Sequence, residues 1–352
     1  MTLQDVIFAI VPADRDAMAA AQKKWDAVGK PLGSLGILED MVVRMAGVFG
    51  TKDFSIEKKA VAIMCADNGG VAEGVSQSGQ EVTAIVVENM AKRQSSVCKM
   101  ARVAGAEIYP VDVGMANPVD HPGLVQRCVR RGGTRNFTKE PAMTRAETEQ
   151  AILVGVESVR VLCDRGVRLI ATGEMGIGNT TTSAAVLSVL LNRSPAEMTG
   201  RGAGLSNAGL ERKIQAIETG IALHHPDPSD AVDVLSKVGG FDLAGICGVF
   251  LGGALYHVPV LIDGLISAAS ALAAATLCPA AKDYMLASHL SGEPAGWPVL
   301  NALEVRPVIQ AGMRLGEGTG AVAVMPILDM TMTVYDGNTF DDLNMEAYTP
   351  QS

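Results

Sequence analysis

Five short apolar runs, each ending in an acidic or polar residue, constrain the fold of this chain more than any other feature. They are AVAIMCAD, EIYPVDVG, VRLIATGEMG, VPVLIDG and DYMLASH, whose polar ends are Asp67, Asp112, Glu174, Asp263 and His289. Helical patterns of roughly ten to twenty residues separate the runs. Such an alternation is typical of a parallel sheet with helices on both faces. We therefore predict an α/β fold.

The polar strand ends have two interpretations. A single Asp after a strand usually caps the next helix, which is a structural role. Ligands of open parallel sheets, however, bind outside the carboxyl ends of the strands, so several such residues on one edge favour a pocket there. Helical spacing also recurs in the first fifty residues, over 14–28 and 35–50. The polar, acidic segment from Val334 to the C-terminus is expected to be loosely held.

Composition excludes several classes of function. The net charge of −9 and an aromatic content of 4% are unsuited to nucleic-acid binding. The apolar region 244–280 is broken by His257, Pro259 and Asp263, which predicts helix, strand and helix rather than a membrane span. The N-terminus lacks the basic region of a signal peptide, and six scattered cysteines predict buried free thiols. We expect a cytoplasmic protein without a metal site.

One glycine-rich segment, RLGEGTG, places Glu317 between Gly316 and Gly318 just before an apolar run. Glycines allow a sharp turn and close approach to a ligand, and a lone carboxylate in such a loop suits a general base. The alternative is structural: Glu317 would then lie in the first turn of a helix, where an acid favours the helix dipole.

A second segment, GEMGIGNTTT, joins a strand to a helix that opens with hydroxyl residues. Backbone N–H groups at such a helix start can hold a phosphate, although Asn179 or Thr180 could equally be a helix cap. Gly202 and Gly204 in RGAGLSNAGLERK could form a second anion site, with Lys213 as its cation or as part of a solvated face. Lys30, in KPLGSLG, lies in a turn and is another candidate phosphate partner.

These motifs together resemble one family, the nicotinate-nucleotide–dimethylbenzimidazole phosphoribosyltransferases. They occur in family order over nearly the whole chain, as KPLGSLGILE, MCADNGGVAEGVS, QEVTAI, VDVGM, GEMGIGNTT, DVLSKVGGFDL, PVLIDGLIS, SHLS and RLGEGTGAVAVMP. The resemblance implies a Rossmann-like parallel sheet flanked by helices over residues 56–326. It also implies a small helical domain built from residues 1–55 and 327–352.

The implied reaction moves the 5-phosphoribosyl group of nicotinate mononucleotide onto a lower-ligand base, such as 5,6-dimethylbenzimidazole. It proceeds with inversion and gives an α-riboside 5′-phosphate for cobamide synthesis. No cofactor or metal is implied, and members act as dimers. The resemblance assigns catalysis to Glu317, Glu174 and Lys213. It assigns phosphate and ribose binding to Gly176, Gly178, Asn179, Thr180, Gly202, Ala203 and Asp263, and the aromatic-acceptor pocket to Ser78, Gln80, Val86 and Leu315.

The chain departs from the family pattern around the acceptor. Asn68 stands where many members have His, Ser78-Gly79-Gln80 replaces a Ser-Pro sequence, and Val86 replaces a frequent Gln. The acceptor therefore stays open between a benzimidazole, a purine and a phenol. The alternatives to a self-sufficient enzyme are a subunit that needs a paralogous partner and a phosphosugar-binding protein without activity.

Overall fold

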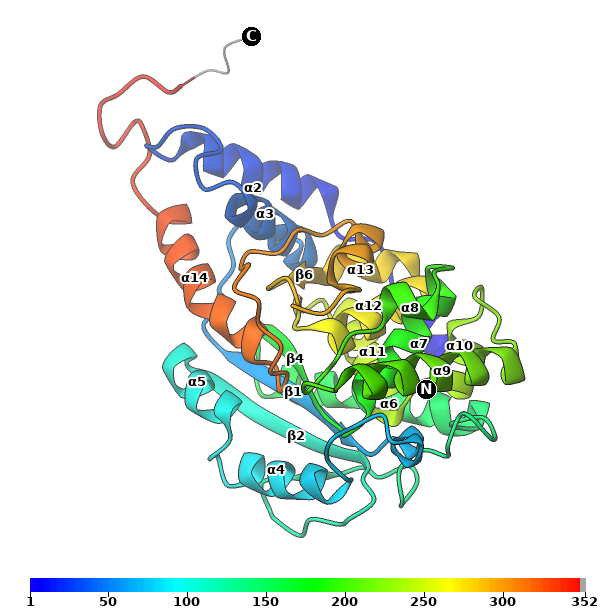
Figure 1. Ribbon diagram of the computed structural model, residues 1–352. Helices are drawn as coiled ribbons and strands as arrows, with labels where there is room; N and C mark the ends of the chain where they lie inside the picture. The colour runs from blue at the N-terminus through cyan, green and yellow to red at the C-terminus, as the bar shows by residue number, and fades with distance from the viewer. Residues whose placement is uncertain (349–352) are drawn as a thin grey trace.

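A six-stranded parallel sheet forms the centre of the structure, a computed structural model that describes residues 1–348 (Figure 1). The strands are β1 (Lys59–Ala66), β2 (Ala106–Gly114), β3 (Val125–Gln126), β4 (Leu169–Met175), β5 (Val260–Ile262) and β6 (Met285–Ala287). Their order is β3-β2-β1-β4-β5-β6, and every neighbouring pair is parallel. The predicted α/β class and the five predicted strands are confirmed, and the short β3 is an addition. The chain reverses its direction of sheet growth between β1 and β4, which makes their carboxyl ends a topological switch point.

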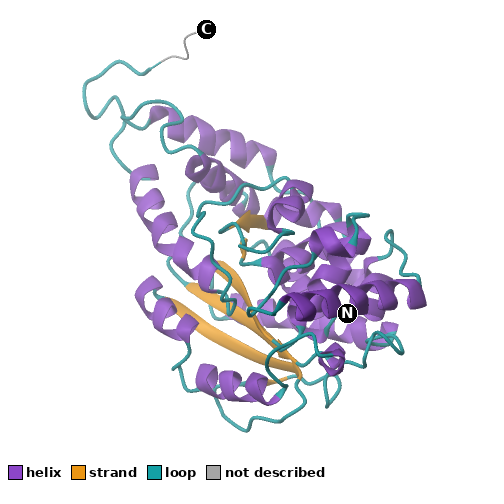
Figure 2. Cartoon of the chain, viewed as in Figure 1, coloured by secondary structure: helices purple, strands orange, loops and turns teal. Residues whose placement is uncertain are grey.

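Helices cover both faces of the sheet (Figure 2). They are α1 (Leu3–Ala9), α2 (Arg15–Ala27), α3 (Ile37–Phe49), α4 (Glu81–Ala91), α5 (Ser96–Ala104), α6 (Arg145–Asp164), α7 (Asn179–Leu190), α8 (Pro195–Met198), α9 (Asn207–His224), α10 (Ala231–Val238), α11 (Phe241–Leu255), α12 (Leu265–Leu277), α13 (Gly296–Leu303) and α14 (Thr319–Tyr335). Two 3₁₀ helices lie at Gly69–Glu73 and Pro279–Tyr284. The helix–strand–helix expected over 244–280 is confirmed as α11, β5 and α12.

The side chains of β1 divide between two hydrophobic cores, because successive residues of a strand point to opposite faces. Ala62 and Met64 belong to the core that includes α6, α11 and α12. Val61 and Ile63 belong to the core that includes α2, α3, α5 and α14. Burial on both faces explains why the strand is a nearly continuous apolar run.

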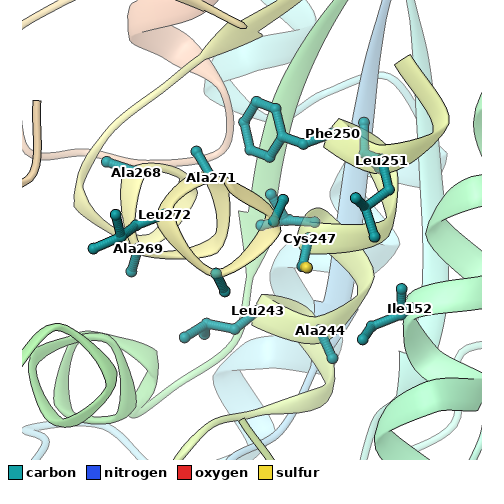
Figure 3. Packing of buried hydrophobic residues seen from close by; sticks show 14 of the residues in the cluster. Ile152, Leu243, Ala244, Cys247, Phe250, Leu251, Ala268, Ala269, Ala271 and Leu272 are labelled. Carbon is teal, nitrogen blue, oxygen red and sulfur yellow. The ribbon is translucent and has the colours of Figure 1, made fainter. Parts of the chain in front are cut away.

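Helix α11 is the best-buried helix of the first core and packs between α6 and α12 (Figure 3). Small residues permit this close packing. A Cβ on Gly155 of α6 would overlap the carbonyl of Gly245, and one on Gly248 would overlap the carbonyl of Ile152. The alanine and glycine content of the chain therefore serves close packing between helices.

Helices α2 and α3 meet the C-terminal segment that begins with α14, whereas α1 packs on α6 and α11. The rings of Trp25 and Tyr335 lie 4.9 Å apart, and Val28 forms an antiparallel bridge with Thr339. The expectation of a loose C-terminal segment is wrong for this part: α14 extends to Tyr335, and the Phe340 side chain is buried. Residues 349–352 lie outside the described part. The predicted boundary at 326/327 falls within α14, and the division into two domains stays a prediction.

The six cysteines are all free; Cys128 and Cys163 are partly exposed, and the other four are buried. None of the helices within residues 1–348 is both long and apolar enough to cross a membrane.

Candidate active site

A cavity of about 310 Å³ lies at the carboxyl ends of β4, β5 and β6. Three of the five strand-end residues line it, namely Glu174, Asp263 and His289. The other two have structural roles: Asp67 accepts hydrogen bonds from Thr83 and the Ala116 amide, and Asp112 accepts from the Met115 amide and pairs with Arg131. The pocket interpretation therefore applies to the ends of β4, β5 and β6, and the structural interpretation applies to the ends of β1 and β2.

The loop that carries Glu317 is held in an unusual backbone conformation beside β4, where α14 begins (Figure 1). Gly316, Glu317 and Gly318 have φ angles of 89°, 62° and 93°. A left-handed conformation costs a non-glycine residue about 1–2 kcal/mol, and such strain persists only where the surroundings enforce it. Helix α14 has Gly318 as its N-cap, so Glu317 precedes the helix. The alternative that placed Glu317 in the first helical turn is therefore wrong.

Neighbouring groups pack tightly around this loop. A Cβ on Gly316 would overlap the Glu174 carboxylate, which explains why glycine precedes Glu317. On the strand below, a Cβ on Gly173 would lie 2.6 Å from the carbonyl oxygen of Glu317. The loop therefore lies directly on β4, and glycines on both sides make this contact possible.

The Glu317 carboxylate is partly exposed and lines the cavity. Its Oε2 accepts a hydrogen bond of 3.0 Å from the backbone N–H of Val97, in the first turn of α5. Ser95, the N-cap of α5, provides no side-chain cap, so Glu317 satisfies an otherwise free amide at the positive end of this helix. No hydrogen bond from the described residues reaches Oε1, which leaves that oxygen for a ligand.

Glu174 is buried at the end of β4, in contact with the Glu317 loop. Burial raises the pKa of Glu174 to about 8, against the opposing effect of the hydrogen bond that its carboxylate accepts from Asn179. Nearby Asp242 is also buried, and its pKa is raised to about 6. Asp242 accepts a 3.3 Å hydrogen bond from Asn68, the residue that departs from the family pattern. The raised pKa of Glu174 favours its protonated form at neutral pH.

Lys213 of α9 is fully buried and does not itself line the cavity. Its Nζ donates to Thr180 Oγ1 at 2.8 Å and to the Gly200 carbonyl at 3.1 Å. Burial lowers its pKa to about 8, and Glu293 opposes this shift. Lys213 therefore supports the cavity wall from behind, through Thr180, and the solvated-face alternative is wrong.

All six predicted phosphate-side residues from the two glycine-rich loops line the cavity: Gly176, Gly178, Asn179, Thr180, Gly202 and Ala203. The N-cap of α7 is Gly178, which offers no side-chain cap. The start of this helix therefore presents its positive end toward the cavity, which suits an anion. Lys30 instead pairs with the buried Glu39 at 2.7 Å and is absent from the wall.

Asp263 lines the cavity, but the backbone of the Glu317 segment engages both its oxygens. They accept hydrogen bonds from the amides of Gly318 (3.2 Å), Gly320 (2.8 Å) and Ala321 (3.0 Å). Burial raises the pKa of Asp263, opposed by His289, whose Nδ1 lies 3.9 Å away. Asp263 therefore acts as the cap of α14.

The predicted acceptor pocket is only partly brought together. Val86 of α4 and the 57% exposed Leu315 line the cavity, whereas Ser78 and Gln80 do not. Gln80 donates a 3.4 Å hydrogen bond to the Asn68 carbonyl instead. The neighbouring residues Val75, Ser76 and Gln77 form this part of the wall.

Among the charged residues of the wall, sequence reasoning missed Arg201, Glu293 and Arg314. Arg314 begins the predicted RLGEGTG segment, so it had a usable signal. Glu293 had none, and it accepts a 3.1 Å hydrogen bond from the Gly202 amide. Within residues 1–348, no group of three or more His, Cys, Asp or Glu side chains could hold a metal ion.

Known proteins resemble this chain over nearly its full length. The sequence profile of a family described as Phosphoribosyltransferase matches residues 10–344. The nicotinate-nucleotide–dimethylbenzimidazole phosphoribosyltransferase of Ruminiclostridium cellulolyticum is 46% identical, over 99% of each chain. An enzyme of the same name from an Escherichia coli strain is 43% identical, over 97% of this chain and 99% of its own.

Solved structures agree with these relatives. The structure of CobT from Thermus thermophilus matches with a TM-score of 0.90 and 38% identity, covering 94% of this chain and 99% of that one. The chain therefore belongs to the nicotinate-nucleotide–dimethylbenzimidazole phosphoribosyltransferase family.

Proposed function

We propose that this chain transfers the 5-phosphoribosyl group of nicotinate mononucleotide to a nitrogen of a lower-ligand base such as 5,6-dimethylbenzimidazole. The product is an α-riboside 5′-phosphate for cobamide synthesis. The observation that carries the proposal is the Glu317 carboxylate, which is held through Oε2 by the Val97 amide and belongs to a residue that lines the cavity. Family membership supports the substrates, because they appear in the names of its relatives.

In the proposed reaction one ring nitrogen of the acceptor uses its lone pair to form a bond to the anomeric carbon. The bond from this carbon to the nicotinate nitrogen breaks, and its electron pair returns to the pyridinium, which leaves as neutral pyridine nitrogen. Glu317 takes the proton from the second ring nitrogen of the acceptor. Attack opposite the leaving group converts the β-linked donor into an α-linked product.

The donor phosphate fits the wall formed by the start of α7 and the Gly202 loop. Helix-start amides and the Thr180 hydroxyl can donate to phosphate oxygens. Lys213 lies directly behind Thr180, where it supplies positive charge without occupying the cavity. Arg201 and Arg314 also lie on the wall and add two guanidinium groups. These cations offset the carboxylates around the cavity, which would otherwise repel a phosphate.

The acceptor is proposed to bind against Val86 and Leu315, which offer apolar contacts to a flat aromatic ring. A purine or a phenol could use the same wall. With a phenol, the attacking atom is oxygen and Glu317 takes the hydroxyl proton.

We also propose that the chain works as a dimer, in which a second copy of the chain or a paralogue covers the exposed Leu315 and Ile85. The reaction is proposed to take place in the cytoplasm, since all six cysteines are free, as is usual in a reducing compartment.

The test offers the purified chain nicotinate mononucleotide with 5,6-dimethylbenzimidazole, adenine or a phenol, and identifies products by mass. The expected result is an α-riboside phosphate and an equal amount of nicotinate. Activity that appears only after a paralogue is added would reject the self-sufficient enzyme. Binding of nicotinate mononucleotide without release of nicotinate would support the alternative that the chain is a phosphosugar-binding protein without activity. Sedimentation of the same sample tests for the second copy.

A further inference from the structure

We propose that Asp263 is a positioning residue that acts on catalysis through the backbone of the Glu317 loop, not through contact with the ribose or phosphate. This inference rests on the proposed function, since it concerns the same reaction. It replaces the ligand-binding role that the family resemblance implies for Asp263.

The hydrogen bonds of Asp263 tie β5 to the segment that follows Glu317. One carboxylate oxygen accepts from the amide of Gly318, the residue next to Glu317. The other oxygen accepts from Gly320 and Ala321 in the first turn of α14. Helix α14 has no cap of its own, because its N-cap residue is a glycine. Asp263 therefore provides from another element the cap that the local sequence lacks.

The charge of Asp263 suits this position. An anion at the start of a helix interacts favourably with the helix dipole, and hydrogen bonds to a charged acceptor are stronger than neutral ones. Glu317 itself keeps a φ of 62°, a conformation that an unsupported loop would leave. By accepting from the Gly318 amide, Asp263 fixes the peptide on the C-terminal side of Glu317. The Val97 amide fixes the Glu317 carboxylate.

His289 completes the arrangement from β6. Its ring lies so close to Gly320 that a Cβ there would overlap it, and its Nδ1 is 3.9 Å from Asp263. Burial lowers the pKa of His289, and Ser288 lies 3.2 Å from the same ring nitrogen. The amides of α14 and the His289 ring therefore occupy the surroundings of the Asp263 carboxylate, which favours a structural partner over a substrate.

The test is Asp263→Asn, which keeps the volume but turns an NH₂ group toward one of the backbone amides. We expect kcat for transfer to fall by about tenfold or more, because small displacements of a catalytic group are costly. The KM for nicotinate mononucleotide should change by less than about threefold, since no substrate contact is lost. In the Glu317→Gln background, the residual transfer rate should not fall further, because both substitutions affect the same group.

Asp14→Asn is the matched control, because Asp14 caps α2 through the amides of Asp16 and Ala17, away from the cavity. It should lower thermal stability but not kcat. A raised KM with unchanged kcat in Asp263→Asn, or a loss that adds to that of Glu317→Gln, would overturn the proposal in favour of ribose binding. If Asp263→Asn does not fold, Asp263→Ser, whose hydroxyl still accepts a hydrogen bond, undergoes the same measurements. A wild-type chain without transfer activity would instead reject the proposed function.

Discussion

Replacing Gly173 with alanine should reduce transfer by about 30- to 100-fold while leaving a folded protein. The new Cβ would lie 2.6 Å from the carbonyl oxygen of Glu317 and 2.9 Å from its carbonyl carbon. Ordinary contacts begin at 3.4 Å, so the backbone of Glu317 must retreat by about 0.8 Å, the difference between 3.4 and 2.6 Å. A misplacement of about 1 Å can cost a catalytic group 100-fold in rate, which sets the expected loss.

The matched control is Gly47→Ala in α3. Its Cβ would also meet its nearest atom at 2.6 Å, but that atom belongs to the flexible Met18 side chain, remote from the cavity. Both variants should lose about 1–3 kcal/mol of stability from overpacking. The two variants are compared by their initial rates of α-riboside phosphate formation. Each rate is normalised to the folded fraction of the variant, taken from thermal melts. Equal rates for Gly173→Ala and Gly47→Ala would refute the claim that the position of Glu317 limits the reaction.

Three other predictions concern Glu174, Thr180 and Phe340. The raised pKa of Glu174 means that its contribution to stability is full below about pH 4.5 and is lost as pH rises through 8. Glu174→Gln should therefore have a higher melting temperature than wild type at pH 9 and match it near pH 4. A difference in melting temperature that does not change with pH would contradict this. Thr180→Val removes the hydroxyl that accepts from the buried lysine, so calorimetry should show weaker binding of nicotinate mononucleotide. Thr181→Val, where the buried hydroxyl has no partner in the described structure, should not weaken it. Phe340→Ala should cost about 3 kcal/mol in denaturant unfolding. The exposed Met345→Ala should cost under about 0.5 kcal/mol, and equal losses would reject a docked C-terminal segment.

The strands were predictable because each of the main ones is a compact apolar run that ends in a polar residue. β3 was not, since it consists only of Val125 and Gln126 within an irregular segment. The docked C-terminal segment was missed for a related reason. Two buried aromatics, Tyr335 and Phe340, anchor a stretch whose composition is otherwise polar and acidic.

The convergence of strand-end residues was also predictable, because parallel strands finish on one edge. The role of each residue was not. Asp112 lies near the end of β2 and Asp263 directly after β5, yet one pairs with Arg131 and the other caps α14 and lines the cavity. Which role applies depends on how distant loops pack, and sequence spacing does not encode this. The same limit applies to Glu293, whose partner Gly202 lies in a separate loop.

Glu317→Gln tests the central claim most directly. Glutamine keeps an oxygen that can accept from the Val97 amide, but it cannot take a proton. With nicotinate mononucleotide and 5,6-dimethylbenzimidazole, the variant should lose at least about 100-fold in turnover, the usual share of general-base catalysis. Its affinity for nicotinate mononucleotide should stay within about threefold of wild type. Glu304→Gln, at another glutamate with a left-handed backbone (φ 58°), is the control and should keep full activity. Near-wild-type turnover by Glu317→Gln would contradict the account.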